Sequence, residues 1–240
     1  MEIEGTKVLV TGAARGLGRE LINAFLAANV NQVFAGIRDE NQIDHIQSQD
    51  SRVRAVLLDV TNETHIANLA HLEPFDILVN NAGVASFGNP LTKNFDEIRT
   101  EMEVNYFGTL RVSRVIAPKM IERRRGVIVN VATAFARINL PMIGTYCASK
   151  AALLSLGQAL RAYLVDYGVS VITVMPTTID TDMSRGADVP KMTTTFVASE
   201  ILSAIREEKH DPPIGDEAHG VLERLHQDPQ GLEQFLIQYR

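Results

Sequence analysis

The chain has 240 residues, a formal net charge of −6 and a single cysteine. This length fits one α/β domain with a substantial core, and the apolar share of 45% excludes wholesale disorder. One cysteine excludes a disulfide framework and a multi-cysteine zinc site. The acidic balance argues against a nucleic-acid partner.

The first residues, Met1–Glu4, are acidic and lead directly into an apolar run. A secretory signal would need a basic segment followed by a long apolar one. A membrane-spanning helix would need about 18 or more consecutive apolar residues, and the longest runs here are strand-sized. The sequence therefore predicts no signal peptide, no membrane association and a cytoplasmic location.

Short runs rich in β-branched residues alternate with longer segments of helical pattern. The predicted strands are Val8–Thr11, Gln32–Ile37, Val53–Leu58, Ile77–Val79, Gly126–Val131 and Val169–Met175. Runs that are apolar on both faces indicate strands covered by helices on both sides. Most spacers are about 10–25 residues long, enough for a crossover helix. The pattern predicts a doubly wound parallel sheet in three layers.

No repeat or low-complexity linker divides the chain, so we expect one domain over residues 1–240. The first helix is predicted over residues 16–28, with Leu17 and Leu21 on its apolar side. The strongest break is Asp211-Pro212-Pro213. The tail of residues 211–240 after it is too short to form a second domain.

The first motif lies where the first strand passes into the first helix. It reads Thr11-Gly12-Ala13-Ala14-Arg15-Gly16-Leu17-Gly18. Glycines there allow a tight turn and a close approach of backbone to a pyrophosphate, which the helix N-terminus attracts. The motif predicts a dinucleotide site; the alternative is a glycine-rich turn with no ligand.

Residues at the end of the second strand bear on the choice of cofactor. An acid at this place would hold the ribose 2′-OH of NAD. Here Gly36 stands instead, with Arg38 two residues on and Arg15 in the glycine loop. Two guanidinium groups near that ribose favour a 2′-phosphate, so NADP(H) is predicted over NAD(H). The alternative is a pair of ordinary surface arginines, with Asp39 partly neutralising Arg38.

The second motif is Tyr146-Cys147-Ala148-Ser149-Lys150, which opens the helix before the sixth strand. Residues i and i+4 share one face of a helix, so the phenol and the ammonium can face one site. Taken alone the pair fits an ordinary surface helix equally well. A phenol has an ordinary pKa near ~10, and a neighbouring cation favours its ionised form.

Other features strengthen this interpretation. Asn80-Asn81-Ala82-Gly83 closes the fourth strand, and Thr133 stands thirteen residues before Tyr146. Asn105 lies in the helix between the fourth and fifth strands, and the segment 176–183 leaves the sixth. With these motifs in this order, residues 6–183 resemble the short-chain dehydrogenase/reductase family in its compact single-domain form.

The resemblance implies a seven-stranded Rossmann-like sheet, a nicotinamide cofactor and a homodimer or homotetramer. It implies a catalytic tetrad of Asn105, Thr133, Tyr146 and Lys150. Tyr146 would protonate the carbonyl oxygen, and Lys150 would bind the nicotinamide ribose and lower the pKa of the phenol. Thr133 would bind the substrate oxygen, and Asn105 would hold a water in a proton path behind Lys150.

The same resemblance implies the cofactor contacts. Asn81, Ala82 and Gly83 would line the adenosine ribose, Asp59 and Val60 would contact adenine, and Ile179 and Thr181 would hold the carboxamide. The remaining predicted cofactor-binding residues are Gly12, Arg15, Gly16, Leu17, Gly18, Arg38, Tyr146, Lys150 and Pro176.

Three positions depart from the family pattern. Thr133 replaces the usual Ser, which adds a methyl group and stiffens χ1. Thr177 replaces the usual Gly after Pro176. The segment 184–194, where the family has its substrate lid, is short, which suggests an open pocket or one closed by another subunit.

Other residues give weaker signals. Cys147 has no His base at a fixed spacing and is interpreted as packing, and no His pair at i,i+3 or i,i+4 supports a metal. Small residues on the helix 146–167 and the apolar spacing of residues 232–237 suit either packing within the subunit or contact with another.

The leading hypothesis is an NADP(H)-dependent oxidoreductase that moves hydride between nicotinamide and a small carbonyl or alcohol substrate. One alternative is a sensor or scaffold that binds the dinucleotide without chemistry, which would have no need of the Tyr146/Lys150 pair. Another is a nucleotide-binding transferase on a similar sheet. Oxidation of NADPH by a panel of aldehydes and ketones separates them.

Overall fold

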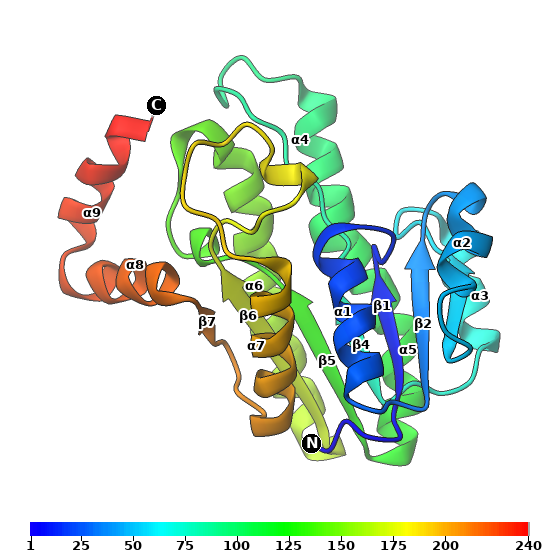
Figure 1. Ribbon diagram of the computed structural model, residues 1–240. Coiled ribbons are helices and arrows are strands. Elements are labelled where there is room, and N and C mark those ends of the chain that lie inside the picture. The colour runs from blue at the N-terminus through cyan, green and yellow to red at the C-terminus, as the bar shows by residue number, and fades with distance from the viewer. Residues whose placement is uncertain (240) are drawn as a thin grey trace.

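Seven parallel strands form one sheet in the order β3-β2-β1-β4-β5-β6-β7. A computed structural model describes residues 1–239, and Figure 1 shows the sheet with helices on both faces. The strands are β1 Lys7–Thr11, β2 Gln32–Ile37, β3 Val53–Leu57, β4 Ile77–Asn80, β5 Gly126–Val131, β6 Val169–Pro176 and β7 Pro213–Ile214. The helices are α1 Gly16–Ala27, α2 Ile43–Gln47, α3 Glu63–Asn68, α4 Phe95–Met102, α5 Thr109–Arg123, α6 Gly144–Leu164, α7 Thr194–Glu207, α8 Asp216–Gln227 and α9 Pro229–Leu236.

Alternate residues of each central strand face opposite layers of the molecule. Val8 and Val10 of β1 belong to a core that α1 and α7 cover, whereas Leu9 and Phe34 belong to a second core against α5. Both sets are fully buried. The β-branched runs are therefore apolar on both faces because both faces are covered.

The predicted fold class is confirmed, with one strand that the residue pattern did not reveal. β7 has only two residues and starts at Pro213, inside the predicted break. It pairs with the end of β6, Met175 opposite Pro213 and Pro176 opposite Ile214. Proline is tolerated in a strand at the edge of a sheet, and β7 is such an edge.

The tail after β7 forms α8 and α9, which project from the β7 side of the body (Figure 1). Its last turn, Ile237–Tyr239, lies against Pro141–Ile143, the short helical turn before α6. The tail therefore returns toward the segment that leads into Tyr146.

The order in which the chain adds strands to the sheet reverses at its centre, between β1 and β4. From β1 the chain winds outward through β2 to β3, and from β4 it winds the other way through β5 and β6. Ligands of doubly wound sheets bind at the carboxyl ends of the strands beside this switch point. The segments that carry the predicted site residues all follow carboxyl ends of strands, so the fold places them along one edge.

Candidate active site

The glycine loop joins β1 to α1 at the switch point. Gly12 and Gly16 have φ of 64° and 54°, in the left-handed region that favours glycine. A Cβ on Gly18 would lie 2.2 Å from the carbonyl oxygen of Gly12, so no side chain fits there. The side chain of Leu17, by contrast, is buried in the core, which leaves only its backbone for a ligand.

The Asn80–Gly83 segment holds this loop in place through Thr11. The Thr11 hydroxyl oxygen accepts hydrogen bonds from the backbone N–H groups of Asn81 (3.0 Å) and Ala82 (2.9 Å). In return the Asn81 amide donates to the carbonyl oxygens of Thr11 (2.9 Å) and Gly12 (3.2 Å). The sequence singled out Asn81 as a cofactor contact but did not reveal that its side chain braces the glycine loop.

Gly36 lies beside the glycine loop, since it is opposite Thr11 in the sheet and its carbonyl oxygen accepts a hydrogen bond from the Ala13 N–H at 2.9 Å. A Cβ on Gly36 would lie 2.8 Å from Leu58 Cδ2 and 3.1 Å from Val10 O, so a side chain at this position would require the end of the Leu58 side chain to move. Arg38 is exposed. The Asp39 carboxylate accepts hydrogen bonds from Asn41, and the alternative that it partly neutralises Arg38 stays open.

Arg15 has a different partner from the one predicted for it. Its Nη1 lies 3.2 Å from Asp182 Oδ2, an exposed ion pair that links the glycine loop to the segment after β6. Arg185 pairs with the same carboxylate. Exposed pairs of this kind contribute little to stability, so Arg15 can exchange Asp182 for a phosphate at little cost.

The adenine-side residues follow β3. The Asp59 carboxylate accepts hydrogen bonds from the Thr61 N–H (2.8 Å) and hydroxyl (2.7 Å). Val60 is buried, and a Cβ on Gly108 would lie 2.6 Å from its Cγ2. Their predicted contact with adenine stays a prediction.

The segment after β6 forms a loop that is closed at its base. Backbone hydrogen bonds join Asp180 N–H to Met192 O (2.8 Å) and Met192 N–H to Thr178 O (2.9 Å). Thr181 packs toward the glycine loop, since a Cβ on Gly16 would lie 3.2 Å from its Cγ2. The predicted lid, residues 184–194, is thus the outer part of a loop whose base adjoins the dinucleotide site.

Tyr146 and Lys150 lie on one face of the first turns of α6. Lys150 Nζ is 5.8 Å from the centre of the Tyr146 ring and donates to the carbonyl oxygen of Val131 at 2.8 Å. Lys150 is buried and Tyr146 is half-buried. A Cβ on Gly83 would lie 3.4 Å from Lys150 Nζ and 3.3 Å from Asn105 Oδ1, so the Asn80–Gly83 segment, Asn105 and Lys150 meet at one point.

Burial dominates the electrostatics of this pair. Burial, followed by the neighbouring Cys147 and Glu101, raises the pKa of the Tyr146 phenol above its ordinary value. Burial also lowers the pKa of Lys150 to about 8. Desolvation disfavours both charged forms and outweighs the lowering of the phenol pKa that was expected from Lys150.

Thr133 lies two residues after β5 and is buried. Its hydroxyl donates to the carbonyl oxygen of Pro176 at 2.9 Å and accepts from the Phe135 N–H at 3.3 Å. The single hydroxyl proton is thus committed to Pro176. To donate to a substrate oxygen, the hydroxyl has to leave that carbonyl.

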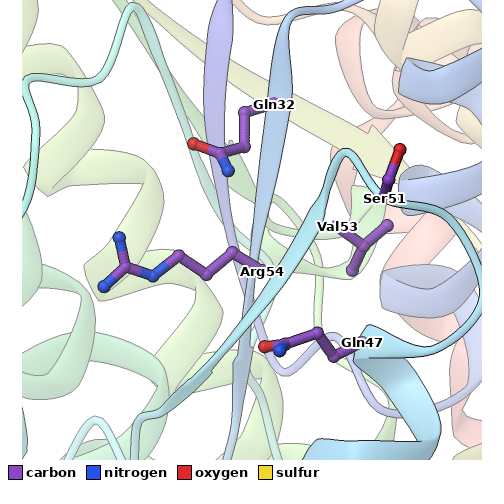
Figure 2. A pocket seen from close by; sticks show the side chains of 5 residues that line it. All are labelled: Gln32, Gln47, Ser51, Val53 and Arg54. Carbon is purple, nitrogen blue, oxygen red and sulfur yellow. The ribbon is translucent and has the colours of Figure 1, made fainter.

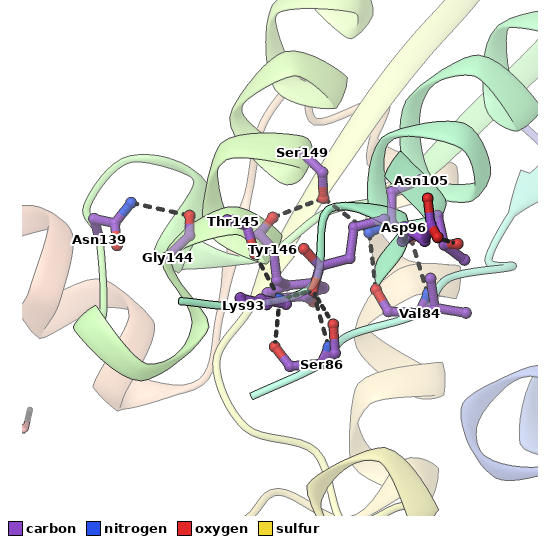
Figure 3. Close-up of polar contacts among 12 residues, drawn as sticks. Val84, Ser86, Lys93, Asp96, Asn105, Asn139, Gly144, Thr145, Tyr146 and Ser149 are labelled. Atoms are coloured by element: carbon purple, nitrogen blue, oxygen red, sulfur yellow. Dashed lines mark hydrogen bonds and ion pairs between the residues drawn. The ribbon is translucent and has the colours of Figure 1, made fainter. Parts of the chain in front are cut away.

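Asn105 lies in a π-helical segment, Glu103–Gly108, between α4 and α5. Its side chain is fully buried and bonds the backbone of Val84 at both ends, at 2.9 Å each. It also donates to the Ser149 hydroxyl at 2.8 Å, and that hydroxyl donates to the backbone carbonyl oxygen of Tyr146 at 2.7 Å (Figure 3). Such π-helical turns are frequent at functional sites, but the sequence alone gave no sign of this one.

A hollow lies at the edge of the sheet opposite the one that carries the glycine loop. It is lined by Gln32, Gln47, Ser51, Val53 and Arg54 (Figure 2). Gln32 and Val53 begin β2 and β3, so this hollow is at the amino ends of the strands. It is remote from the edge that carries Tyr146 and Lys150.

The residues present fit a bound dinucleotide. The glycine loop leaves room where a Cβ would collide, and the first N–H groups of α1 are available to a phosphate. Tyr146 and Lys150 lie at the same carboxyl edge of the sheet as this loop. A family model described as short chain dehydrogenase matches residues 6–190, and the chain belongs to this family.

Individual relatives agree with this assignment. A short-chain dehydrogenase from Burkholderia cenocepacia, solved in complex with NADP, is 36% identical and has a TM-score of 0.93, covering 98% of this chain and 99% of its own. A short-chain dehydrogenase/reductase from Burkholderia phymatum, solved with NAD, is 23% identical with a TM-score of 0.85 over 96% of each chain, which shows the fold alone.

A curated relative, dehydrogenase/reductase SDR family member 7B of Xenopus laevis, is 31% identical over 200 residues, 77% of this chain. The chain spans 62% of the length of that relative and 64% of the length of the Xenopus tropicalis protein of the same name. Among residues 1–239, no helix is both long and apolar enough to span a bilayer.

Proposed function

We propose that this protein is an NADP(H)-dependent reductase of a ketone or aldehyde, or the dehydrogenase of the corresponding alcohol. The observation that carries the proposal is the placement of Tyr146 and Lys150 on one face of α6, with Lys150 Nζ 5.8 Å from the ring centre. Both side chains lie at the carboxyl edge of the sheet, beside the glycine loop.

The bound nicotinamide supplies or accepts the hydride. In the reductive direction Tyr146 donates its phenolic proton to the carbonyl oxygen of the substrate. The phenol is protonated at neutral pH, since its ordinary pKa is ~10 and burial raises it further. The raised pKa makes it a weaker acid, so donation depends on the charge that develops on the carbonyl oxygen as hydride arrives. In the oxidative direction the phenolate accepts the proton of the alcohol, and the ammonium of Lys150 stabilises that charge.

Thr133 would donate to the substrate oxygen, and Asn105 supports the turn that carries the phenol. The Thr133 hydroxyl now joins the segment after β5 to the end of β6, through the carbonyl oxygen of Pro176. Asn105 joins the Val84 backbone to the Ser149 hydroxyl. That hydroxyl in turn donates to the backbone carbonyl oxygen of Tyr146. The Asn105 side chain thus holds the turn of α6 that carries the phenol, while its predicted role in a water-mediated proton path stays a prediction.

The preference for NADP(H) over NAD(H) rests on Gly36, Arg38 and Arg15. The sequence has Gly36, and not an acid, at the place where an acid would bind a 2′-OH. Arg38 is exposed and Arg15 is held only by an exposed ion pair, so both guanidinium groups can bind a 2′-phosphate. The NADP complex of the Burkholderia cenocepacia protein supports this preference.

The test is nicotinamide absorbance during incubation with a panel of ketones, aldehydes and alcohols and each of the two cofactors. We expect turnover with NADPH that exceeds turnover with NADH. Tight dinucleotide binding with no turnover of any panel member would instead support the non-catalytic sensor. Group transfer without a change in nicotinamide absorbance would support the transferase.

A further inference from the structure

A buried ion pair lies beside the predicted active site and takes no part in the mechanism above. Lys93 Nζ is 2.8 Å from Glu101 Oε1, and both side chains are only 1% exposed. Lys93 comes from the loop after β4, and Glu101 from the last turn of α4. Nothing in the sequence singled out either residue.

Each charge is held by several hydrogen bonds. Lys93 Nζ also donates to the carbonyl oxygen of Ser86 (2.9 Å) and to the hydroxyl of Thr145 (2.6 Å). Glu101 Oε1 also accepts from the Ser86 N–H and hydroxyl, at 2.9 Å each. Figure 3 shows Lys93 between Ser86 and Thr145, so one ammonium joins the loop after β4 to the first turn of α6.

Thr145 directly precedes Tyr146, which makes this connection relevant to the chemistry. A second bond joins the same two segments, from Gly88 N–H to Met142 O at 2.9 Å. The first turn of α6 has no side-chain cap. Lys93 therefore supplies a contact that fixes the turn carrying the phenol.

The pair also acts on the phenol through its charge. Glu101 is one of the groups that raise the pKa of Tyr146, after burial and Cys147. Burial would raise the pKa of Glu101 itself, but its hydrogen bonds, that from Lys93 foremost, hold it below the ordinary value. Glu101 Oε2 is buried and has no hydrogen-bond partner among the described residues, so the hydrogen bonds that join this carboxylate to Lys93 and Ser86 all reach Oε1.

We propose that Lys93, Glu101 and Thr145 form a positioning device for Tyr146, which fixes the first turn of α6 and so the place of the phenol hydroxyl. The proposal rests on the proposed function of Tyr146 as the proton donor. The pair is a poor choice for stability alone, since burying two charges costs as much as their attraction returns. Displacing a reacting group by about 1 Å can cost about 10²-fold in rate.

Threonine 145 gives the cleanest variants, because removing either charge alone leaves the other buried and destabilises the fold. Thr145→Val keeps the shape of the side chain and removes the hydroxyl, whereas Thr145→Ser keeps the hydroxyl. The matched control is Thr6→Val, which removes another buried hydroxyl, bonded to Ile3 O at 2.6 Å far from Tyr146. Thermal unfolding of each variant shows whether it is folded.

We expect Thr145→Val to lower kcat at least about tenfold while the Kd for NADPH stays within about twofold. Thr145→Ser should restore most of the rate, and Thr6→Val should leave kcat unchanged. Full turnover by Thr145→Val would overturn the positioning role. So would a loss in Thr145→Ser as large as that in Thr145→Val, since the hydroxyl would then be irrelevant.

A second measurement needs no substrate and so separates this proposal from the proposed function. Amide hydrogen exchange followed by mass spectrometry reports the opening of the first turn of α6. We expect faster exchange of this turn in Thr145→Val than in wild type, because the contact from Lys93 to the Thr145 hydroxyl is lost. Thr145→Ser and Thr6→Val should exchange there as wild type does. Unchanged exchange of this turn in Thr145→Val would contradict the positioning role even if no carbonyl substrate is turned over.

Discussion

At the scale of single residues, burial changes the roles of both central side chains. Tyr146 and Lys150 are removed from water together, so the phenol is harder to ionise and the amine is easier to deprotonate. The site therefore holds a neutral phenol beside an amine whose pKa is about 8. At neutral pH this amine is still mostly protonated, and a bound anion would keep it protonated to higher pH.

This leads to a pH dependence of dinucleotide binding. Because the phosphates of the ligand favour the charged amine, binding raises the pKa of Lys150 above about 8 and takes up a proton. The affinity for NADPH should therefore fall as pH rises above that value. Calorimetry in two buffers of different ionisation enthalpy measures the proton uptake. Lys150→Met should bind without it; uptake that persists in this variant would place the titrating group elsewhere.

Arg38 carries the prediction on cofactor choice. Arg38→Ala should weaken NADPH by about 1–3 kcal/mol, the value of a charge-assisted hydrogen bond, and leave NADH almost unaffected. Equilibrium dialysis or calorimetry with both cofactors checks this. Equal losses for the two cofactors would show that Arg38 does not bind the 2′-phosphate.

Thr133 carries a prediction on the rate. Thr133→Ala should lower kcat by about 10²–10³-fold if its hydroxyl stabilises charge on the substrate oxygen. Thr133→Ser is the control, because it keeps the hydroxyl that bonds Pro176 O. An alanine variant that turns over at the normal rate would assign that stabilisation to another donor.

At the scale of elements, six strands could be predicted because strands covered by helices on both faces are short, continuous runs of apolar, β-branched residues. The predicted bounds of β2 and β5 match the structure residue for residue, and the other four differ by one residue at an end. β7 could not be predicted from the residue pattern, because two residues are too few to show an alternation of apolar and polar side chains. The π-helical turn around Asn105 and the closed base of the 178–192 loop depend on contacts between distant segments, which one sequence does not display.

The turn from β1 to α1 gives a test at this scale. Gly18→Ala should lower the affinity for NADPH at least about tenfold and reduce the Tm, because its Cβ would meet the Gly12 carbonyl oxygen at 2.2 Å and force the backbone apart. Gly220→Ala in α8 is the matched control, since nothing lies within 4 Å of its Cβ. It should stabilise the helix by up to about 1 kcal/mol. Equal effects of both changes would rule out a special role for the glycine loop.

At the scale of the whole molecule, the parallel topology explains why motifs far apart in sequence form one site. Thr11, Asn81, Thr133 and Pro176 follow four neighbouring strands, and their carboxyl ends lie side by side. The sequence predicted this convergence. It did not predict the Lys93–Glu101 pair, because a lysine in a polar loop and a glutamate in a charged helix both suggest exposure. The predicted homodimer or homotetramer stays a prediction, which sedimentation velocity can test.

The central claim is that the Tyr146 phenol transfers the proton in a nicotinamide-dependent reaction. The most direct measurement compares wild type with Tyr146→Phe, following NADPH oxidation on the best panel carbonyl together with NADPH binding. The account predicts that kcat falls by at least about 10²-fold while NADPH binds with unchanged affinity. Turnover by Tyr146→Phe at a rate close to that of wild type would contradict it.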